Sequence, residues 1–256
     1  VCRSGQMEAR LMRAAVPSQT GAVFTGLSSK CAEAQGDRFE ISWMGGAAGT
    51  QLTTLQISGD INQNGILDNG DVFFDLDGSS PGVGPHFPFT IAGNSDVLLS
   101  DITGWTLSPD KTTLTITVAN WTAGKKLIFE ADVDELDSAP NSLVEGAEFQ
   151  GSIITGTWTD PAGHHEVATG SGVYYDNYDH LIPTGVKALP SPHNLPLDSQ
   201  LPPGEGTDER TAGAGFTVQQ QVKPFTISGV VYHDVNLSGT RNGAGETGIA
   251  NVQLSL

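Results

Sequence analysis

The segment "TLTITV", residues Thr113–Val118, decides the fold class because its polar and apolar residues alternate strictly. Leu114, Ile116 and Val118 would face one side of an extended chain and the threonines the other, as in a half-buried β-strand. Similar short runs, rich in Thr, Ile, Val and aromatic residues, recur as "RFEISW", "TQLTTLQIS", "DVFFDL", "KKLIFEADV" and "GSIITGTWT". With no helical pattern between them, they predict an all-β protein with an antiparallel β-sandwich over residues 36–180.

Charge and composition limit the classes of partner. The 256 residues include 12 Lys and Arg against 29 Asp and Glu, a formal net charge of −17. Such an excess of negative charge argues against nucleic acid or anionic lipid as a partner and suits cation binding. No apolar run reaches the length of about eighteen residues that a membrane span needs, so we predict none.

The regions outside this sandwich differ from it in composition. Residues 1–35 contain the one helix-like pattern, "GQMEARLMRAA", and two cysteines, Cys2 and Cys31, that could pair or stay free. Residues 181–222 hold a proline-rich stretch, which predicts a linker or a strap lying over the first domain. Residues 223–256 then read as strand, acidic turn and strand, the start of a second β-sandwich.

The stretch "DINQNGILDNGD", residues 60–71, has oxygen-bearing side chains at alternate positions and a glycine at the sixth. Calcium takes about six to eight oxygen ligands, which a twelve-residue loop supplies from positions 1, 3, 5, 7, 9 and 12. The spacing therefore predicts a calcium site formed by Asp60, Asn62, Asn64, the Ile66 carbonyl, Asp68 and Asp71. Asp replaces the usual final Glu, and the flanks look like strands rather than helices. The alternative is a polar turn that happens to be acidic.

A second stretch, "DVNLSGTRNGAGE", residues 234–246, repeats this spacing with its last acidic residue one place later. Its predicted ligands are Asp234, Asn236, Ser238, the Thr240 carbonyl, Asn242 and Glu246. The formal charge of this ligand set is −2, against −3 for the first loop, so the second loop should bind calcium more weakly.

The stretch "ISGVVYHDVNLSGTRNGAGETGIANVQLSL", residues 227–256, resembles the opening of the SdrD B-like (SD-repeat B) domains, which are prealbumin-like sandwiches of bacterial surface proteins. The matching positions are Asp234, Asn236, Gly239, Gly245, Glu246, Gly248 and Ile249. The resemblance implies a prealbumin-like fold for residues 223–256 and a structural calcium ion in their loop. The related Cna-B domains often form isopeptide bonds through a Lys on the first strand. The strand "GVVYHD" has no Lys, so we expect no such bond.

The stretch "QMEARLMRAA" is similar to the Leu-Glu-Pro-Arg-x-Leu-Leu motif near the start of large exported bacterial proteins. Glu8, Arg10, Leu11 and Met12 fit that motif, while Ala9 replaces its proline. Residues 36–180 look like the N-terminal β domain that can precede SD-repeat B modules in such proteins. Together these resemblances imply an extracellular or cell-surface location.

Catalytic motifs are not predicted. His164, His165 and Glu166 lack the His-Glu-x-x-His pattern of a metalloprotease helix, and Ser171 lacks the Gly-x-Ser-x-Gly elbow. We therefore expect no enzyme.

Two further clusters of residues each allow a structural and a functional interpretation. The acidic run "FEADVDELD" predicts a solvated acidic strand edge in preference to a third cation site. We expect Tyr174, Tyr175 and Tyr178 to be core or corner residues rather than a sugar-binding platform.

The expected function is a calcium-stabilised structural module of an adhesin, surface layer or filament. The alternatives are a carbohydrate- or protein-binding adhesive module and, less favoured, an accessory domain of a secreted hydrolase. Expected partners are calcium, other copies or other surface proteins, and, under the adhesive alternative, glycans. Two strands alone cannot complete a sandwich. We therefore expect continuation of the chain, the first domain or a neighbouring subunit to cover the apolar residues of the last segment, Val230, Val231, Ile249, Val252 and Leu254.

Overall fold

The computed structural model divides the chain into two compact units, residues 15–223 and residues 1–14 with 224–256. It describes residues 17–26, 36–79, 82, 84–137, 142–143, 146, 148–176, 211–223, 232–243 and 245–249. The helix-like N-terminal stretch, both cysteines and the prolines of residues 181–210 lie outside the described residues.

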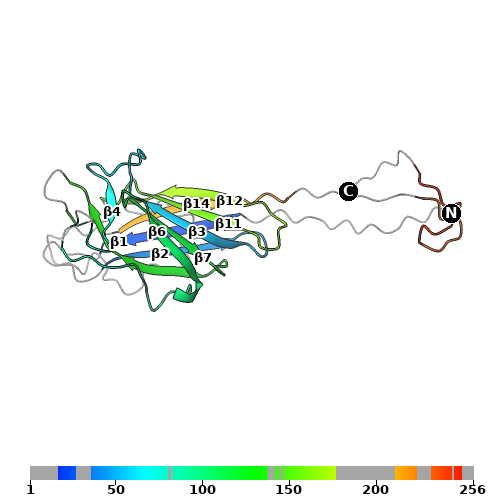
Figure 1. The fold of residues 1–256 in the computed structure, drawn as a ribbon, viewed down its shortest axis with the longest axis horizontal. Coiled ribbons are helices and arrows are strands. Elements are labelled where there is room, and N and C mark those ends of the chain that lie inside the picture. The colour runs from blue at the N-terminus through cyan, green and yellow to red at the C-terminus, as the bar shows by residue number, and fades with distance from the viewer. Residues whose placement is uncertain are drawn as a thin grey trace. The chain divides into compact units, whose positions relative to one another are not determined.

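The larger unit is an antiparallel β-sandwich (Figure 1), which confirms the predicted fold class. One sheet has the order β13-β14-β1-β2-β8-β5, formed by Tyr175–Asp176, Thr211–Val218, Ser18–Thr25, Asp37–Gly45, Lys126–Ala131 and Thr90–Ile91. The facing sheet has the order β12-β11-β3-β7-β6, formed by Ala168–Val173, Ile153–Thr159, Gln51–Ser58, Thr113–Val118 and Ile102–Leu107. A small sheet has the order β10-β9-β4, formed by Ser142–Leu143, Val133–Glu135 and Val72–Phe74.

Helical structure in the described residues is limited to the short 3-10 turn η1, Leu99–Asp101. No helix in that part of the chain is long and apolar enough to cross a membrane.

The sandwich extends beyond both of its predicted bounds. β1 lies in the segment assigned to the N-terminal region, and β14 lies in the segment assigned to the linker. These two strands pair along their whole length, from Ser18 opposite Val218 to Thr25 opposite Thr211. The composition of β14, "TAGAGFTV", is linker-like, but its inward positions are buried within the sheet.

Small residues in β14 and β12 are explained by the close approach of the two sheets at this side of the sandwich. A Cβ added at Gly170 would collide with Val218, and one at Gly172 would lie 2.9 Å from the ring of Phe216. Glycine therefore allows the two backbones to come together where a larger residue would hold them apart.

The core lies between the two large sheets and is rich in aromatic residues. Leu114, Ile116 and Val118 of β7 point into it, as their alternation predicts. Phe39 stacks on Phe129 with a centroid distance of 4.7 Å. The core also includes a contact between sheets, from Trp43 of β2 to Trp158 of β11, with a centroid distance of 6.1 Å. Each fully buried side chain of this size contributes about 1.5–3 kcal/mol to folding through removal of apolar surface from water.

The small sheet positions the candidate sites. β4 pairs with β9, with Val72 opposite Glu135 and Phe74 opposite Val133. The loop of residues 60–71 leads directly into β4, and Asp75 follows directly after it. Acidic residues therefore lie at both ends of one three-residue strand.

The second unit is described only from residue 232 to residue 249, without residue 244. Tyr232 and Gly248 form an antiparallel bridge, and His233 N donates to the Thr247 carbonyl at 3.4 Å. Ile249 is the one described member of the apolar set expected to be covered, and it is 44% exposed. The second sandwich stays a prediction.

Candidate metal sites

The first loop begins at a position that only glycine can occupy. Gly59 N donates to the Thr112 carbonyl at 2.8 Å, and Val72 N donates to the Gly59 carbonyl at 3.0 Å. A Cβ at Gly59 would collide with the Val72 carbonyl oxygen. The two ends of the loop are therefore held together by the backbone, whatever its side chains bind.

Two buried carboxylates organise the interior of the first loop. Asp60 accepts hydrogen bonds from Asn64 N at 3.1 Å and Gly65 N at 2.7 Å. Asp71, only 1% exposed, accepts from Ile61 N and Asp68 N, both at 3.0 Å. Left-handed backbone at Gln63 and Gly65, with φ of 57° and 75°, lets the chain curl around these carboxylates.

The side chains between them converge on Asp68. Asn62 Nδ2 donates to Asp68 Oδ1 at 2.7 Å, and Asn64 Nδ2 donates to Asp68 Oδ2 at 2.8 Å. A bound cation would have to replace these two donors, and a rotation of each amide would turn its oxygen toward the ion. The predicted ligands are therefore gathered in one loop, but in a hydrogen-bonded arrangement of their own.

The pKa of Asp71 is raised above its ordinary value. Burial is the largest cause, and the nearby negative charges of Asp68 and Asp60 add to it, against the two backbone hydrogen bonds that lower it. A raised pKa means that the ionised carboxylate lacks full compensation in this environment. A bound cation would supply that compensation.

The second loop repeats the hydrogen bonds of the first, position by position. Asp234 accepts from Ser238 N at 3.0 Å and from Gly239 N at 2.8 Å, at the same fifth and sixth positions. The backbone is again left-handed at the fourth and sixth positions, with φ of 57° at Leu237 and 76° at Gly239. The third-position amide, Asn236 Nδ2, again donates to the ninth-position side chain, here Asn242 Oδ1, at 2.8 Å.

The later acidic residue of the second loop takes the role of Asp71. Glu246 Oε2 accepts from Asn242 N at 2.6 Å and Gly243 N at 2.8 Å. Glu246 is 4% exposed, and its Oε1 is buried without a hydrogen-bond partner in the described part of the chain. The predicted ligand oxygen of Thr240 accepts from Ser238 Oγ at 2.9 Å.

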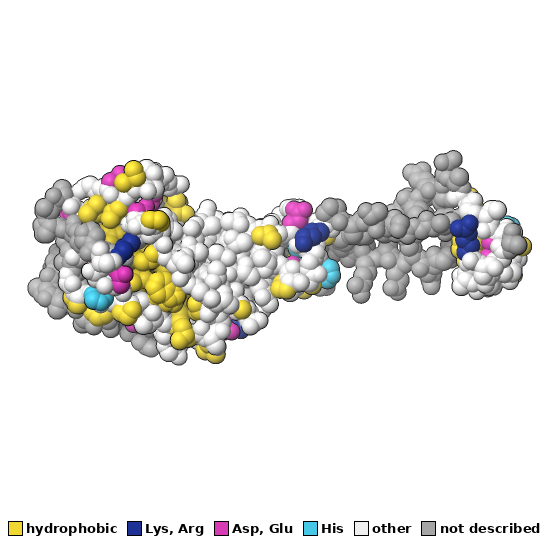
Figure 2. Space-filling model, in the orientation of Figure 1, with side chains coloured by type: hydrophobic (Ala, Val, Ile, Leu, Met, Phe, Trp, Pro, Cys, Tyr) yellow, Lys and Arg dark blue, Asp and Glu magenta, His cyan; other side chains and the backbone are white. Residues whose placement is uncertain are grey.

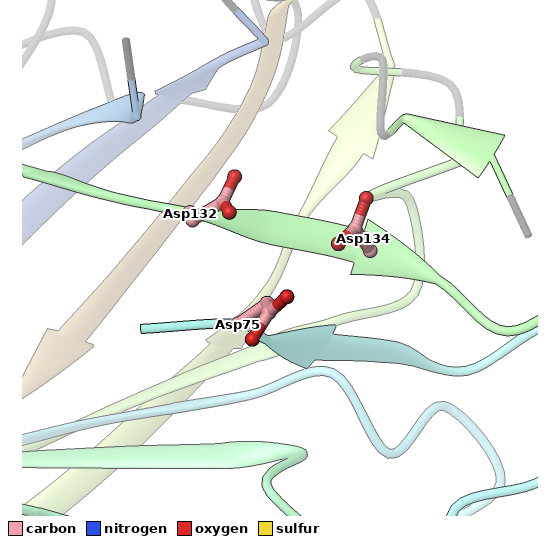
Figure 3. Close-up of side chains that lie close together, drawn as sticks. All are labelled: Asp75, Asp132 and Asp134. Carbon is pink, nitrogen blue, oxygen red and sulfur yellow. The ribbon is translucent and has the colours of Figure 1, made fainter. Parts of the chain in front are cut away.

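Asp75, Asp132 and Asp134 form the one group of three acidic, His or Cys residues in the described ranges whose ligand atoms lie within 4.8 Å of one another (Figure 3). Oxygens bound to one calcium ion at about 2.4 Å can be at most about 4.8 Å apart. The carboxylates of Asp60, Asp68 and Asp71 do not form such a group. At least one of these three carboxylates would therefore have to move or act through a water in the first loop, and the ninth position, here Asp68, often acts through a water.

These three aspartates correct the prediction of a solvated acidic edge. Asp132 and Asp134 are 0% exposed, Asp75 is 4% exposed, and β9 lies between β4 and β10. Asp132 Oδ2 accepts from Phe87 N at 3.2 Å, and Asp75 Oδ1 accepts from Gly78 N at 3.0 Å. Three carboxylates this close repel one another, and a cation among them would offset that repulsion, so the cluster could hold a metal ion. The spacing of residues in the sequence does not predict this cluster, because Asp75 is far from Asp132 and Asp134 along the chain.

The other singled-out residues have local roles. The buried Asp160 carboxylate accepts from His165 Nδ1 at 2.9 Å and from His164 N at 3.0 Å. Tyr174 is fully buried in the core, whereas Tyr175 is 44% exposed and Tyr178 lies outside the described residues. Burial of Tyr174 agrees with the preferred prediction of a core residue and removes this side chain from any exposed sugar-binding platform.

Comparison with protein-family models gives no match, and comparison with curated proteins and with solved structures gives none either.

Proposed function

We propose that the chain is a calcium-stabilised structural module of an extracellular or cell-surface protein, such as an adhesin, a surface layer or a filament. The observation that carries the proposal is the repetition of one hydrogen-bond pattern in two loops that belong to separate units. Each loop is left-handed at its fourth and sixth positions, although Gln63 and Leu237 have little in common chemically. A shared ligand requirement explains this agreement better than two independent polar turns.

Charge and burial support a divalent cation. The first loop has three carboxylates, with the pKa of Asp71 raised by burial and like charge. In the second loop, Glu246 Oε1 is buried and has no hydrogen-bond partner among the described residues. Calcium suits these irregular sets of carboxylate, amide and carbonyl oxygens, whereas magnesium demands near-octahedral geometry and keeps several waters.

The proposed role is structural and not that of a sensor. Extracellular calcium modules bind with dissociation constants of about 10⁻⁴–10⁻³ M. At a tenfold excess of calcium over the dissociation constant, one site adds about 1.4 kcal/mol of stability. That energy suffices to hold the entry into β4 in place but is too small to drive a large change of population between conformations.

Thermal unfolding of the intact chain tests the proposal. We expect calcium to raise the unfolding temperature above its value in chelator, and magnesium to raise it less. Glu246→Gln should lower the calcium affinity of the second loop, so that more calcium is needed for the same rise in unfolding temperature. Glu166→Gln, which removes the same charge at an exposed position, should leave the calcium response unchanged. Equal midpoints in calcium, magnesium and chelator would end the proposal, and immunolabelling of intact native cells would test the location.

One observation favours the alternative of a protein-binding adhesive module. Hydrophobic side chains gather over the region of β6 (Figure 2), which is an edge strand. Trp105 is 44% exposed beside Phe89, and Leu98 and Leu99 are more exposed still. Large exposed apolar patches often mark contact surfaces, here proposed for a second copy of the chain. Sedimentation should then show concentration-dependent association that Trp105→Ser weakens; a monomer at all concentrations would exclude it.

A further inference from the structure

Three Asn-Gly steps lie within or beside the two loops: Asn64-Gly65, Asn69-Gly70 and Asn242-Gly243. At such a step the backbone nitrogen of the glycine can attack the Asn Cγ. The C–N bond to the side-chain amide breaks, ammonia leaves with the proton of the attacking nitrogen, and a five-membered succinimide forms. Water then opens either imide C–N bond, leaving aspartate or isoaspartate. Glycine favours the reaction because it has no Cβ to block the approach and has a flexible backbone.

In two of these Asn-Gly steps, hydrogen bonds hold both the Asn side chain and the attacking glycine nitrogen in place. Asn64 Oδ1 accepts from Ile66 N at 2.8 Å, Asn64 Nδ2 donates to Asp68, and the attacking nitrogen of Gly65 donates to Asp60 at 2.7 Å. The side chain of Asn64 is therefore hydrogen-bonded to residues that follow the attacking Gly65 in the chain.

Asn242 is held in the same manner. Its Oδ1 accepts from Asn236 Nδ2, its Nδ2 donates to Thr240 Oγ1 at 2.8 Å, and Gly243 N donates to Glu246 at 2.8 Å. Succinimide formation at Asn64 or Asn242 requires several of these bonds to open at once.

Asn69 differs from both. Its side chain is exposed and makes no hydrogen bond to any described residue, so the electrophilic Cγ is free to turn. Only the attacking nitrogen is held, because Gly70 N donates to the Leu136 carbonyl at 2.8 Å. We propose that Asn69 is the deamidation site of the folded protein and that loop hydrogen bonds protect Asn64 and Asn242.

The site matters because of where it lies. Asn69 and Gly70 are the central residues of a turn closed by Asp71 N donating to the Asp68 carbonyl at 3.0 Å. Isoaspartate would lengthen the main chain inside this turn, and either product adds a carboxylate between Asp68 and Asp71. These hydrogen bonds belong to the ion-free loops, so the deamidation rates are measured in the presence of a chelator.

The experiment incubates the intact folded chain in mildly alkaline ¹⁸O-labelled water and maps its peptides by mass spectrometry. Fragmentation separates Asn64 from Asn69 within one peptide. Each hydrogen bond that must open lowers the reactive population several-fold, so Asn69 should deamidate about tenfold or more faster than Asn64 and Asn242. In urea, where the loops are unfolded, the three steps should react at similar rates. Equal rates in the folded chain, or a faster Asn64 or Asn242, would overturn the proposal.

Two variants test the cause of the difference. Thr240→Val keeps the shape of an exposed side chain but removes the acceptor of Asn242 Nδ2, so the rate at Asn242 should rise several-fold while the rate at Asn64 stays unchanged. An unchanged rate at Asn242 would contradict protection by these bonds. Asn69→Gln should abolish the fast reaction, because cyclisation at glutamine would need a six-membered ring. If the fast reaction persists in this variant, its site is not Asn69.

Discussion

Asp68→Asn isolates the contribution of charge to the first loop. The substitution keeps the size of the side chain but reduces the formal charge of the predicted ligand set from −3 to −2. In chelator the variant loses one of the two hydrogen bonds accepted from Asn62 and Asn64, and it gains relief from the charge of Asp71. We expect these effects to offset each other to within about 1 kcal/mol.

The effect in calcium should be larger. If Asp68 acts through a water, its charge lies about 4 Å from a doubly charged ion. Coulomb's law at the dielectric constant of water then gives about 2 kcal/mol, or a dissociation constant about 30-fold higher. Burial of the neighbouring carboxylates would increase this value.

Isothermal titration of the intact chain with calcium, repeated for the variant, measures the change. The second loop serves as an internal reference because its ligands are untouched. Asp101→Asn is the matched control: it removes one charge but keeps an acceptor for Leu98 N, which lies 3.0 Å from Asp101 Oδ2. A calcium affinity of the first loop that is the same in Asp68→Asn as in the wild type would refute the assignment of Asp68 to the ion.

The remaining predictions concern the sandwich itself. Gly170→Ala should lower the free energy of unfolding by about 1–3 kcal/mol in urea, because the added Cβ meets Val218; Gly93→Ala, where nothing lies within 4 Å, should not. Trp158→Ala should cost about 3–5 kcal/mol by leaving a cavity between the sheets, measured the same way. Burial alone would raise the pKa of Asp160, but the hydrogen bonds it accepts, led by one from a histidine ring, hold that pKa below its ordinary value. The ionised carboxylate therefore stabilises the fold above its unfolded-state pKa, and this stability is lost as pH falls through the folded-state pKa. The stability difference between wild type and Asp160→Asn should thus shrink from neutral to acid pH, and a constant difference would contradict the sign.

The sequence predicted the strands whose apolar residues alternate, and it missed those whose burial depends on distant partners. β7 is read correctly because Leu114, Ile116 and Val118 need only a core on one side. β3 is also predicted, within "TQLTTLQIS", but its side-chain pattern is irregular because Leu52 and Leu55 are three residues apart and both buried. A register shift opposite Thr157 and Trp158 restores the alternation, and the sequence of β3 alone does not predict this shift.

The candidate sites show the same division. The loop of residues 60–71 could be found because its potential ligands are contiguous, and its turn-forming Gly65 is part of the pattern. The cluster of Asp75, Asp132 and Asp134 could not, because pairing of β4 with β9 creates it. Asp132 and Asp134 looked like a solvent-facing strand edge because sequence alone does not say that β9 has a neighbour on each side.

The place of β14 has a consequence for how the molecule reaches its native state. This strand completes the sheet beside β1, yet it comes nearly two hundred residues later in the chain. Pairing over such a separation must first meet a large loop-closure entropy, which makes folding slow. Until residue 218 has been synthesised, β1 lacks one neighbour and the inward side chains of Ala22 and Phe24 have no complete sheet around them. A nascent chain of this protein should therefore stay open to chaperones until β14 has left the ribosome.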